Sequence, residues 1–236
     1  MSNPARIAVL ASGGGTNLQA LLDRFNAAEH PAARVDLVVG SRPGIGALER
    51  AARAGVASLV IDTREGGIEC FGDALLDALE HFGIDLVVLA GWLQLLPPAV
   101  VERFHGRMLN VHPALLPAFG GRGMYGMRVH RAVIASGARI SGATVHLVDE
   151  RYDEGAILAQ WPVPVLPADT PESLAARVLR VEHRILPLAV EALARGEPVA
   201  SGDADDALAF ELVQGAPADD SLRRIVRLEG AAVAAE

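Results

Sequence analysis

The sequence contains no lysine and only one cysteine. The absence of lysine and the scarcity of cysteine each exclude several classes of protein. All 21 basic residues are arginine. Lysine grips phosphate in P-loops and supplies the amine of Schiff-base enzymes, so we expect neither ATP nor pyridoxal phosphate as a cofactor. Cys70 alone cannot form an internal disulfide, which indicates a reducing compartment and excludes Cys-rich zinc sites. We also expect no metal cofactor.

Long apolar runs, basic clusters and aromatic residues are scarce as well. No apolar run reaches the roughly 18 residues of a membrane span, and the start of the chain shows no signal-peptide pattern, so we expect a cytoplasmic protein that does not bind membranes. The formal net charge is −8, whereas nucleic-acid surfaces need clustered cations. The expected partners are small molecules and not nucleic acid, and the sequence leaves both a monomer and a homodimer open.

Short apolar segments alternate with amphipathic ones through the first half of the chain. RIAVLA and DLVVLA are nearly continuous apolar runs, typical of strands buried on both faces. The expected strands are residues 6–11, 35–40, 57–61, 85–90 and 107–112, and the expected helices are residues 18–28, 46–55, 71–82 and 97–104. This alternation predicts an α/β fold with a doubly wound, mostly parallel, Rossmann-like sheet.

The pattern changes in the second half. A Gly-rich loop at 118–128, a short helix at 129–136, strands at 139–148 and 156–165 and a long helix at 171–195 are expected in that order. Thr170 should cap the long helix and Pro187 should bend it.

Length and composition indicate a single domain followed by a tail. With 236 residues, 51% of them hydrophobic, the chain can bury one sizeable core. We expect residues 1–198 to form that domain, with the N-terminal half holding a phosphate subsite and the C-terminal half the reactive groups. Residues 199–236 form a small C-terminal appendage of unknown role, with short strands expected around 208–213 and 222–228.

The glycine-rich segment SGGGTNL lies between the first expected strand and helix. Parallel sheets present backbone N–H groups and a helix N-terminus to anions at this place. The third glycine of a dinucleotide fingerprint would fall at Leu18, so a small phosphate is the favoured ligand. The candidate phosphate-binding residues are Gly13, Gly14, Gly15, Thr16 and Asn17. The alternative is a tight turn capped by Thr16, with no ligand.

Asn110 and His112 lie two residues apart at the end of an expected strand, so their side chains share one face. Open α/β sheets bind ligands at the carboxyl ends of their strands, and Pro113 ends the strand there. An amide donor and an imidazole that converge on one point can stabilise an oxyanion as a carbonyl becomes tetrahedral. We interpret the pair as catalytic; the alternative is a packed core histidine.

The acidic turn DERYDEG supplies a carboxylate for this pair. We choose Asp153, although the sequence hardly separates it from Asp149. A carboxylate near His112 should raise its pKa and keep the ring charged near neutral pH. His146 either lines the site or packs in the core, and the remaining histidines, which show no metal-ligand spacing, are expected to be packed or solvated.

Five longer segments point to a known family. SGGGTNLQALL, DLVVLAGWLQLL, MLNVHPALLPAF, SGATVHLVDERYDEGAILAQ and RVEHRILP follow one another between residues 5 and 198. Together they resemble the phosphoribosylglycinamide formyltransferase family, the folate-dependent enzymes of purine synthesis. The resemblance implies transfer of a formyl group from 10-formyltetrahydrofolate, as co-substrate, to the amine of glycinamide ribonucleotide.

The resemblance also implies roles for particular residues. Asn110 and His112 would hold the oxyanion, Asp153 would keep His112 charged, and Glu182 would face the glycinamide end of the ribonucleotide. The residues implied to bind folate are Leu93, Gln94, Leu95, Leu96, Asn110 and Asp149. Family members often carry arginine where this chain has Gln94 and about Ile68, and their loop is often shorter than AFGGRGMYGMRVHR, in which Arg122 or Arg128 could bind an anion.

Two kinds of rival remain. A formyltetrahydrofolate deformylase would use the same reactive core with water in place of the amine, and it usually carries an N-terminal regulatory domain that is not expected here. Methionyl-tRNA and sugar-nucleotide formyltransferases fit less well, because their additional domains are not expected. A non-catalytic phosphate-ligand binding protein would need the glycine loop but not Asn110, His112 and Asp153 together.

Overall fold

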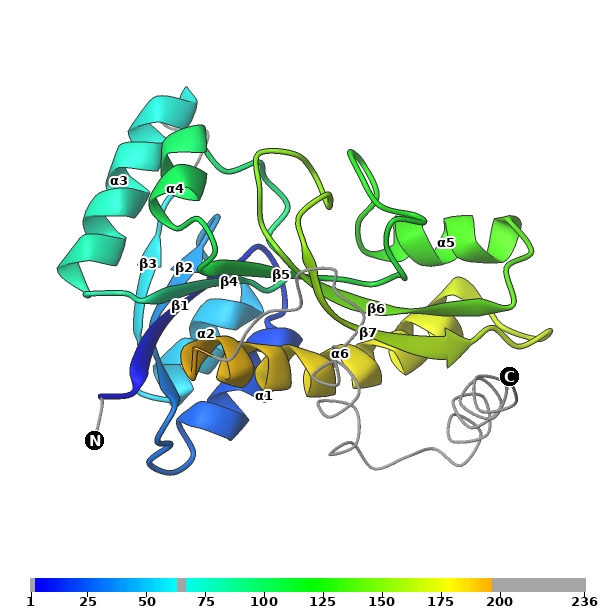
Figure 1. Cartoon of the computed structure of the whole chain (residues 1–236), viewed down its shortest axis with the longest axis horizontal. Coiled ribbons are helices and arrows are strands. Elements are labelled where there is room, and N and C mark those ends of the chain that lie inside the picture. Colours follow the sequence, from blue (N-terminus) through cyan, green and yellow to red (C-terminus); the bar gives the residue numbers. More distant parts are fainter. Residues whose placement is uncertain (1–2, 63–66, 197–236) are drawn as a thin grey trace, which may run out of the picture.

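A single seven-stranded sheet organises the part of the chain that the structure describes (Figure 1). The structure is a computed structural model and describes residues 3–62 and 67–196. The strands are β1 (Ala5–Ala11), β2 (Ala33–Gly40), β3 (Ala57–Val60), β4 (Leu86–Leu89), β5 (Met108–His112), β6 (Ile140–Leu147) and β7 (Ile157–Pro164). The helices are α1 (Thr16–Phe25), α2 (Gly46–Arg53), α3 (Gly67–His81), α4 (Pro98–Arg103), α5 (Met127–Ala135) and α6 (Pro171–Ala194).

The strand order is β3-β2-β1-β4-β5-β6-β7. The first five strands pair in parallel, whereas β6 runs antiparallel to both β5 and β7. The predicted α/β class with a mostly parallel, doubly wound sheet is therefore confirmed. The elements expected within residues 3–62 and 67–196 all occur, with boundaries that differ by a few residues; α3, for example, begins at Gly67 instead of residue 71.

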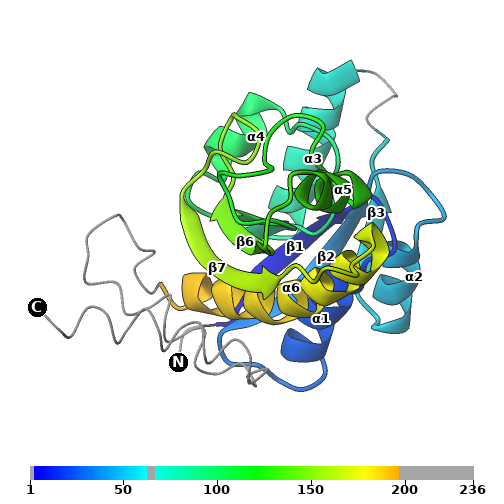
Figure 2. The same ribbon diagram turned by 90° about the vertical axis from the view of Figure 1, so that its right-hand side faces the viewer.

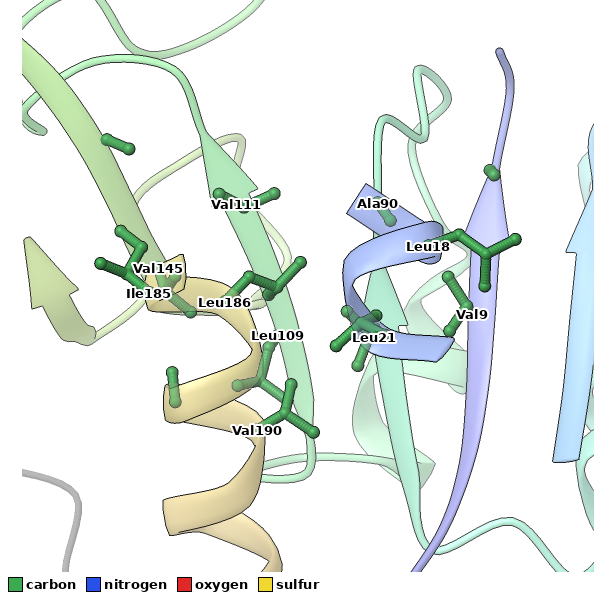
Figure 3. Packing of buried hydrophobic residues seen from close by; sticks show 14 of the residues in the cluster. Val9, Leu18, Leu21, Ala90, Leu109, Val111, Val145, Ile185, Leu186 and Val190 are labelled. Atoms are coloured by element: carbon green, nitrogen blue, oxygen red, sulfur yellow. The ribbon is translucent and has the colours of Figure 1, made fainter. Parts of the chain in front are cut away.

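Helices cover both faces of the sheet (Figure 2). Buried residues of α1, α2, α5 and α6 form one apolar cluster with the sheet, and those of α3 and α4 form a second cluster on the other face. Figure 3 shows Leu109 of β5 beside Leu186 and Val190 of α6, and Leu18 of α1 beside Val9 of β1. These two layers fix the carboxyl ends of β1, β4 and β5 along one edge of the sheet.

The long helix α6 begins as the sequence predicts. The Thr170 side chain accepts a hydrogen bond from the Ser173 backbone N–H, and the Ser173 side chain accepts one from the Thr170 backbone N–H, which is a capping box. Pro187 lies inside the helix. Across residues 3–62 and 67–196, no helix is both long and apolar enough to cross a membrane.

The predicted tail, residues 199–236 with its two short strands, lies outside the described residues. The division at residue 198 stays a prediction.

Candidate active site

Asn110 and His112 lie on β5 and line one cavity of about 660 Å³. β5 ends at His112 because Pro113 follows it. Asp153, from the turn after β6, lines the same cavity. The three residues predicted to be catalytic are therefore brought together, although they lie up to 43 positions apart in sequence.

Both ring nitrogens of His112 have neighbours in this arrangement. Nε2 lies 2.9 Å from the backbone oxygen of Phe119 and must carry the proton, because a carbonyl only accepts. Nδ1 lies 3.5 Å from Oδ2 of Asp153. The His112 N–H therefore points at the Phe119 carbonyl and not at an open place for an oxyanion.

Asp153 raises the pKa of His112, as predicted, but this effect does not set the net direction of the shift. The ring is 3% exposed, and burial lowers the pKa of His112 below its ordinary value of 6.5 more than the Asp153 charge and the Phe119 carbonyl raise it. Burial disfavours the charged ring because water no longer solvates it. The lowered pKa favours the neutral form of His112.

Asn110 pairs with a histidine that the sequence left undecided. Asn110 and His146 stand opposite each other in the β5–β6 ladder, and Nδ2 of Asn110 lies 3.1 Å from Nε2 of His146. Nδ1 of His146 lies 2.8 Å from the Leu147 oxygen and must donate to it, so Nε2 accepts from the amide. One N–H of Asn110 thus donates to His146, and the second makes a long contact of 3.5 Å with Oδ1 of Asp153.

The turn that carries Asp153 is held tightly. Asp153 has a left-handed φ of 57°, and its Oδ2 accepts a hydrogen bond of 2.9 Å from the Gly121 backbone N–H. A Cβ on Gly155 would lie 1.8 Å from the Leu147 oxygen, so only glycine allows the turn to return so closely. Burial opposes the charge of Asp153, but the two histidine rings and the Gly121 amide outweigh it and lower the pKa of the carboxyl.

The segment after His112 is anchored by Thr144 of β6. The Thr144 hydroxyl is fully buried, donates to the Ala114 oxygen at 2.6 Å and accepts from the Leu116 N–H at 3.0 Å. Gln160 of β7 donates to the same hydroxyl and to the Leu116 oxygen, at 3.0 Å and 2.8 Å. These contacts fix where the chain turns away from His112 toward Phe119.

The glycine loop has the form of an anion cradle. Gly15 is the N-cap of α1 with a left-handed φ of 72°, and no side chain caps the helix, so the alternative of a turn capped by Thr16 is wrong. A Cβ on Gly15 would lie 2.7 Å from Cα of Ala47, which only glycine avoids. Within the described part of the chain, the backbone N–H groups of residues 13–16 have no hydrogen-bond partner, as is usual at a helix N-terminus that can take an anion.

Asn17 connects this loop to α6. Its Nδ2 donates to Oε2 of Glu182 at 2.7 Å, and both side chains are buried and line the main cavity. Burial raises the pKa of Glu182 above its ordinary value, although the bond from Asn17 opposes this. The Oδ1 atom of Asn17 is buried without a partner among the described residues. Thr16 instead lines a separate surface cavity with Arg50.

The predicted folate-binding residues all line the main cavity: Leu93, Gln94, Leu95, Leu96, Asn110 and Asp149. Trp92 joins them and stacks on Phe71 with ring centroids 5.8 Å apart. Ile68 is 53% exposed and is not among the cavity residues.

Sequence reasoning missed several groups of this site. His130 was expected to be packed or solvated; it is buried against the cavity, where burial and the nearby His112 lower its pKa. The Phe119 carbonyl and the Gly121 N–H belong to the backbone and leave no sequence signal. His146 had a signal, because it stands two residues from Thr144 on a strand that would pair with β5.

The fold and the site define an α/β protein in which an amide, an imidazole and a carboxylate converge on one cavity beside an anion cradle. The chain belongs to the formyl transferase family, whose model matches residues 5–190. The family membership expected from the sequence is thus confirmed.

Named relatives agree with this family. The chain is 44% identical, over 80% of its length, to the chloroplastic phosphoribosylglycinamide formyltransferase of Vigna unguiculata, and 45% identical, over 76%, to that of Arabidopsis thaliana. It spans about three fifths of these relatives, 60% and 62% of their length. A crystal structure of glycinamide ribonucleotide transformylase 1 from Symbiobacterium toebii matches with a TM-score of 0.79 and 42% identity, covering 86% of this chain and 93% of that one.

Proposed function

We propose that the protein transfers the formyl group of 10-formyltetrahydrofolate to the amine of 5-phosphoribosylglycinamide, giving formylglycinamide ribonucleotide and tetrahydrofolate. The observation that carries the proposal is the convergence of Asn110, His112 and Asp153 on one cavity, which Asn17, the residue after the glycine loop, also lines. The names of the plant relatives and of the bacterial structure support the choice of substrates.

The cavity suits two substrates of this size and chemistry. Its volume of about 660 Å³ lies within the usual range for small-molecule sites. Leu89, Leu96 and Val148 give it an apolar wall for a pterin ring, and the unpartnered N–H groups of residues 13–16 suit a phosphate. Glu182, joined to that loop through Asn17, is placed for the ribose and glycinamide side.

The proposed reaction needs oxyanion stabilisation and two proton movements. The substrate amine attacks the formyl carbon, and the second N–H of Asn110 stabilises the oxygen that becomes negative. The attacking nitrogen loses a proton, the C–N bond to the folate breaks and the departing folate nitrogen gains a proton. His112, neutral beforehand, takes up and then delivers that proton, and the ionised Asp153 stabilises the imidazolium while it exists.

We propose the same surroundings as the sequence suggested: cytoplasm, small-molecule substrates only, with no nucleic acid or membrane, and a monomer or homodimer. The reaction as written requires no metal, ATP or pyridoxal phosphate.

The test is an absorbance assay with 10-formyltetrahydrofolate, run with and without the ribonucleotide. We expect turnover only with the ribonucleotide. His112→Ala should bind both substrates and lose turnover by at least about 100-fold, while His105→Ala, at an exposed position after α4, should behave as wild type. Turnover without the ribonucleotide would indicate the deformylase. Equal rates for His112→Ala and wild type would remove the role assigned to His112, and ligand binding without turnover in both proteins would favour a binding protein.

A further inference from the structure

Two arginines at the cavity have no ionic partner among the residues that the structure describes. Arg122 and Arg128 line the cavity and are exposed at its surface. Among residues 3–62 and 67–196, neither makes a hydrogen bond or an ion pair. A third arginine of the cavity, Arg151, pairs with Glu154 at 2.7 Å. Other arginines of the described chain do form ion pairs, including Arg6, Arg34 and Arg177.

The acidic side chains of the same cavity contact groups other than Arg122 and Arg128. Asp153 contacts two histidine rings and the Gly121 N–H. Asp149 accepts a hydrogen bond of 2.8 Å from the Arg151 backbone N–H, and Glu182 accepts one from Asn17. None of these three carboxylates forms an ion pair with Arg122 or Arg128 in the described structure, so an anionic part of a ligand would meet two guanidinium groups that no carboxylate contacts.

Arg128 is also held in place. Its guanidinium carbon lies 4.8 Å from the centre of the Tyr125 ring, a cation–π contact that reduces the freedom of a long side chain. A planar, oriented guanidinium suits a carboxylate, which it can bind through two parallel hydrogen bonds.

We propose that Arg122 and Arg128 bind the glutamate carboxylates of the folate co-substrate; this inference rests on the proposed function. The pterin and aminobenzoyl rings are uncharged and fit the apolar wall, so the acidic tail must leave the cavity toward solvent, where both arginines stand. The tail would then be recognised by Arg122 in the loop between β5 and α5 and by Arg128 in the first turn of α5 (Figure 1).

The ribonucleotide phosphate is the competing anion, and the topology argues against it. The phosphate has its own cradle after β1, whereas the arginine loop follows β5, and β4 stands between these strands. Neighbouring strands are about 4.8 Å apart, so the two loops start roughly 10 Å from each other. Gly121, next to Arg122, bonds to Asp153 on the β6 side of the site, which is farther from the cradle.

The experiment compares two formyl donors that differ only in the tail. Wild type, Arg122→Gln, Arg128→Gln and the double variant are assayed with 10-formyltetrahydrofolate and with 10-formyltetrahydropteroate, which lacks glutamate. Arg131→Gln is the matched control, because Arg131 lies on the same helix, is exposed and does not line the cavity. Dissociation constants of tetrahydrofolate and tetrahydropteroate are measured by equilibrium titration beside the kinetics.

We expect each single variant to raise KM and Kd for the glutamate-bearing compounds about threefold, and the double variant about tenfold, as for exposed charge pairs. The pteroate compounds, KM for the ribonucleotide and Arg131→Gln should stay at wild-type values. A rise in KM for the ribonucleotide alone would assign the arginines to the phosphate and overturn the inference, as would unchanged constants for both donors. Absence of formyl transfer by wild type would overturn the proposed function instead, and the titrations would still decide whether the arginines recognise the tail.

Discussion

Two neighbours of His112 raise its pKa, and the burial of the ring lowers it. The Phe119 carbonyl holds Nε2–H and Asp153 faces Nδ1, while burial wins and lowers the pKa of His112. Asp153 is therefore the main group that keeps the proton affinity of His112 from falling further.

Asp153→Asn should lower the pKa of His112 below its wild-type value, because the charge that favours the imidazolium is removed. We expect kcat to fall by a factor of about 10²–10⁴, the usual contribution of proton transfer. Titration of the His112 ring by NMR and steady-state assays measure the two effects. Glu154→Gln, in the same turn but paired with Arg151, is the control; an unchanged His112 pKa in Asp153→Asn would contradict the prediction.

Glu182 is placed to bind the ribonucleotide, but the burial of its ionised carboxylate destabilises the folded state. Its pKa is raised by burial, so the folded state holds this proton more tightly than the unfolded state does. The corresponding stability is present below the ordinary pKa of 4.5 and is lost as pH rises through the folded pKa.

Glu182→Gln should keep an oxygen that accepts from Asn17 and should remove this pH dependence. We expect the variant and wild type to unfold alike in denaturant at pH 4, and the variant to be the more stable at pH 7. KM for the ribonucleotide should rise about tenfold, since a hydrogen bond to a charged group is lost. Glu102→Gln, at an exposed position on α4, is the control, and equal stability differences at both pH values would refute the argument.

At the scale of elements, β5 and β6 place the reactive groups and β6 also secures the loop that follows. Thr144 supplies the hydroxyl that satisfies both the Ala114 oxygen and the Leu116 N–H inside the core. Such buried backbone groups are costly when they lose their partner.

Thr144→Val should destabilise the protein by about 3 kcal/mol, because it leaves two buried backbone groups unsatisfied at 1–3 kcal/mol each. Thr144→Ser retains the hydroxyl and should cost only about 1 kcal/mol for the lost methyl group. Guanidinium unfolding of both variants measures the difference. If the two variants lost the same stability, the hydrogen bonds would not be the cause.

Successive side chains of a strand point to opposite faces of the sheet, and this alternation made part of the site predictable. Asn110 and His112 could be placed on one face because they are two residues apart on an apolar run, and the acidic turn could be assigned to the next pair of strands. The burial of His112 depends on which helices and loops close over it, which no local pattern contains, so the net direction of its pKa shift could not be predicted. The Phe119 carbonyl was out of reach for the same reason.

At the scale of the molecule, the fold could be predicted because apolar runs and amphipathic segments alternate so regularly. The sequence predicted β6 and β7 as two longer strands joined by an acidic turn, but it did not predict that β6 runs antiparallel to β5. His130 could not be assigned, because its position depends on the path of residues 118–126, where glycines allow many conformations.

Ligands should stabilise the whole domain, since the cavity is formed by residues from β4, β5 and β6 and from α1, α5 and α6. At 100 times its Kd, a ligand that binds only the folded state adds about 2.7 kcal/mol. For a domain of this size we expect tetrahydrofolate and the ribonucleotide each to raise Tm by roughly 5–10 °C, measured by scanning calorimetry. Ribose without phosphate is the control; an equal shift with it would contradict a site built for the phosphate.

The register of β5 against β6 also limits how the sequence can change in length. Asn110 faces His146 and His112 faces Thr144 only while the present pairing holds, and slipping either strand by one residue would turn its side chains to the opposite face. The loop between β5 and α5 can lengthen without disturbing that ladder, whereas one inserted residue within either strand would abolish the site and leave the sheet intact. Insertions are accordingly expected in the loop between β5 and α5, outside the contacts of Phe119 and Gly121, and not within the two strands.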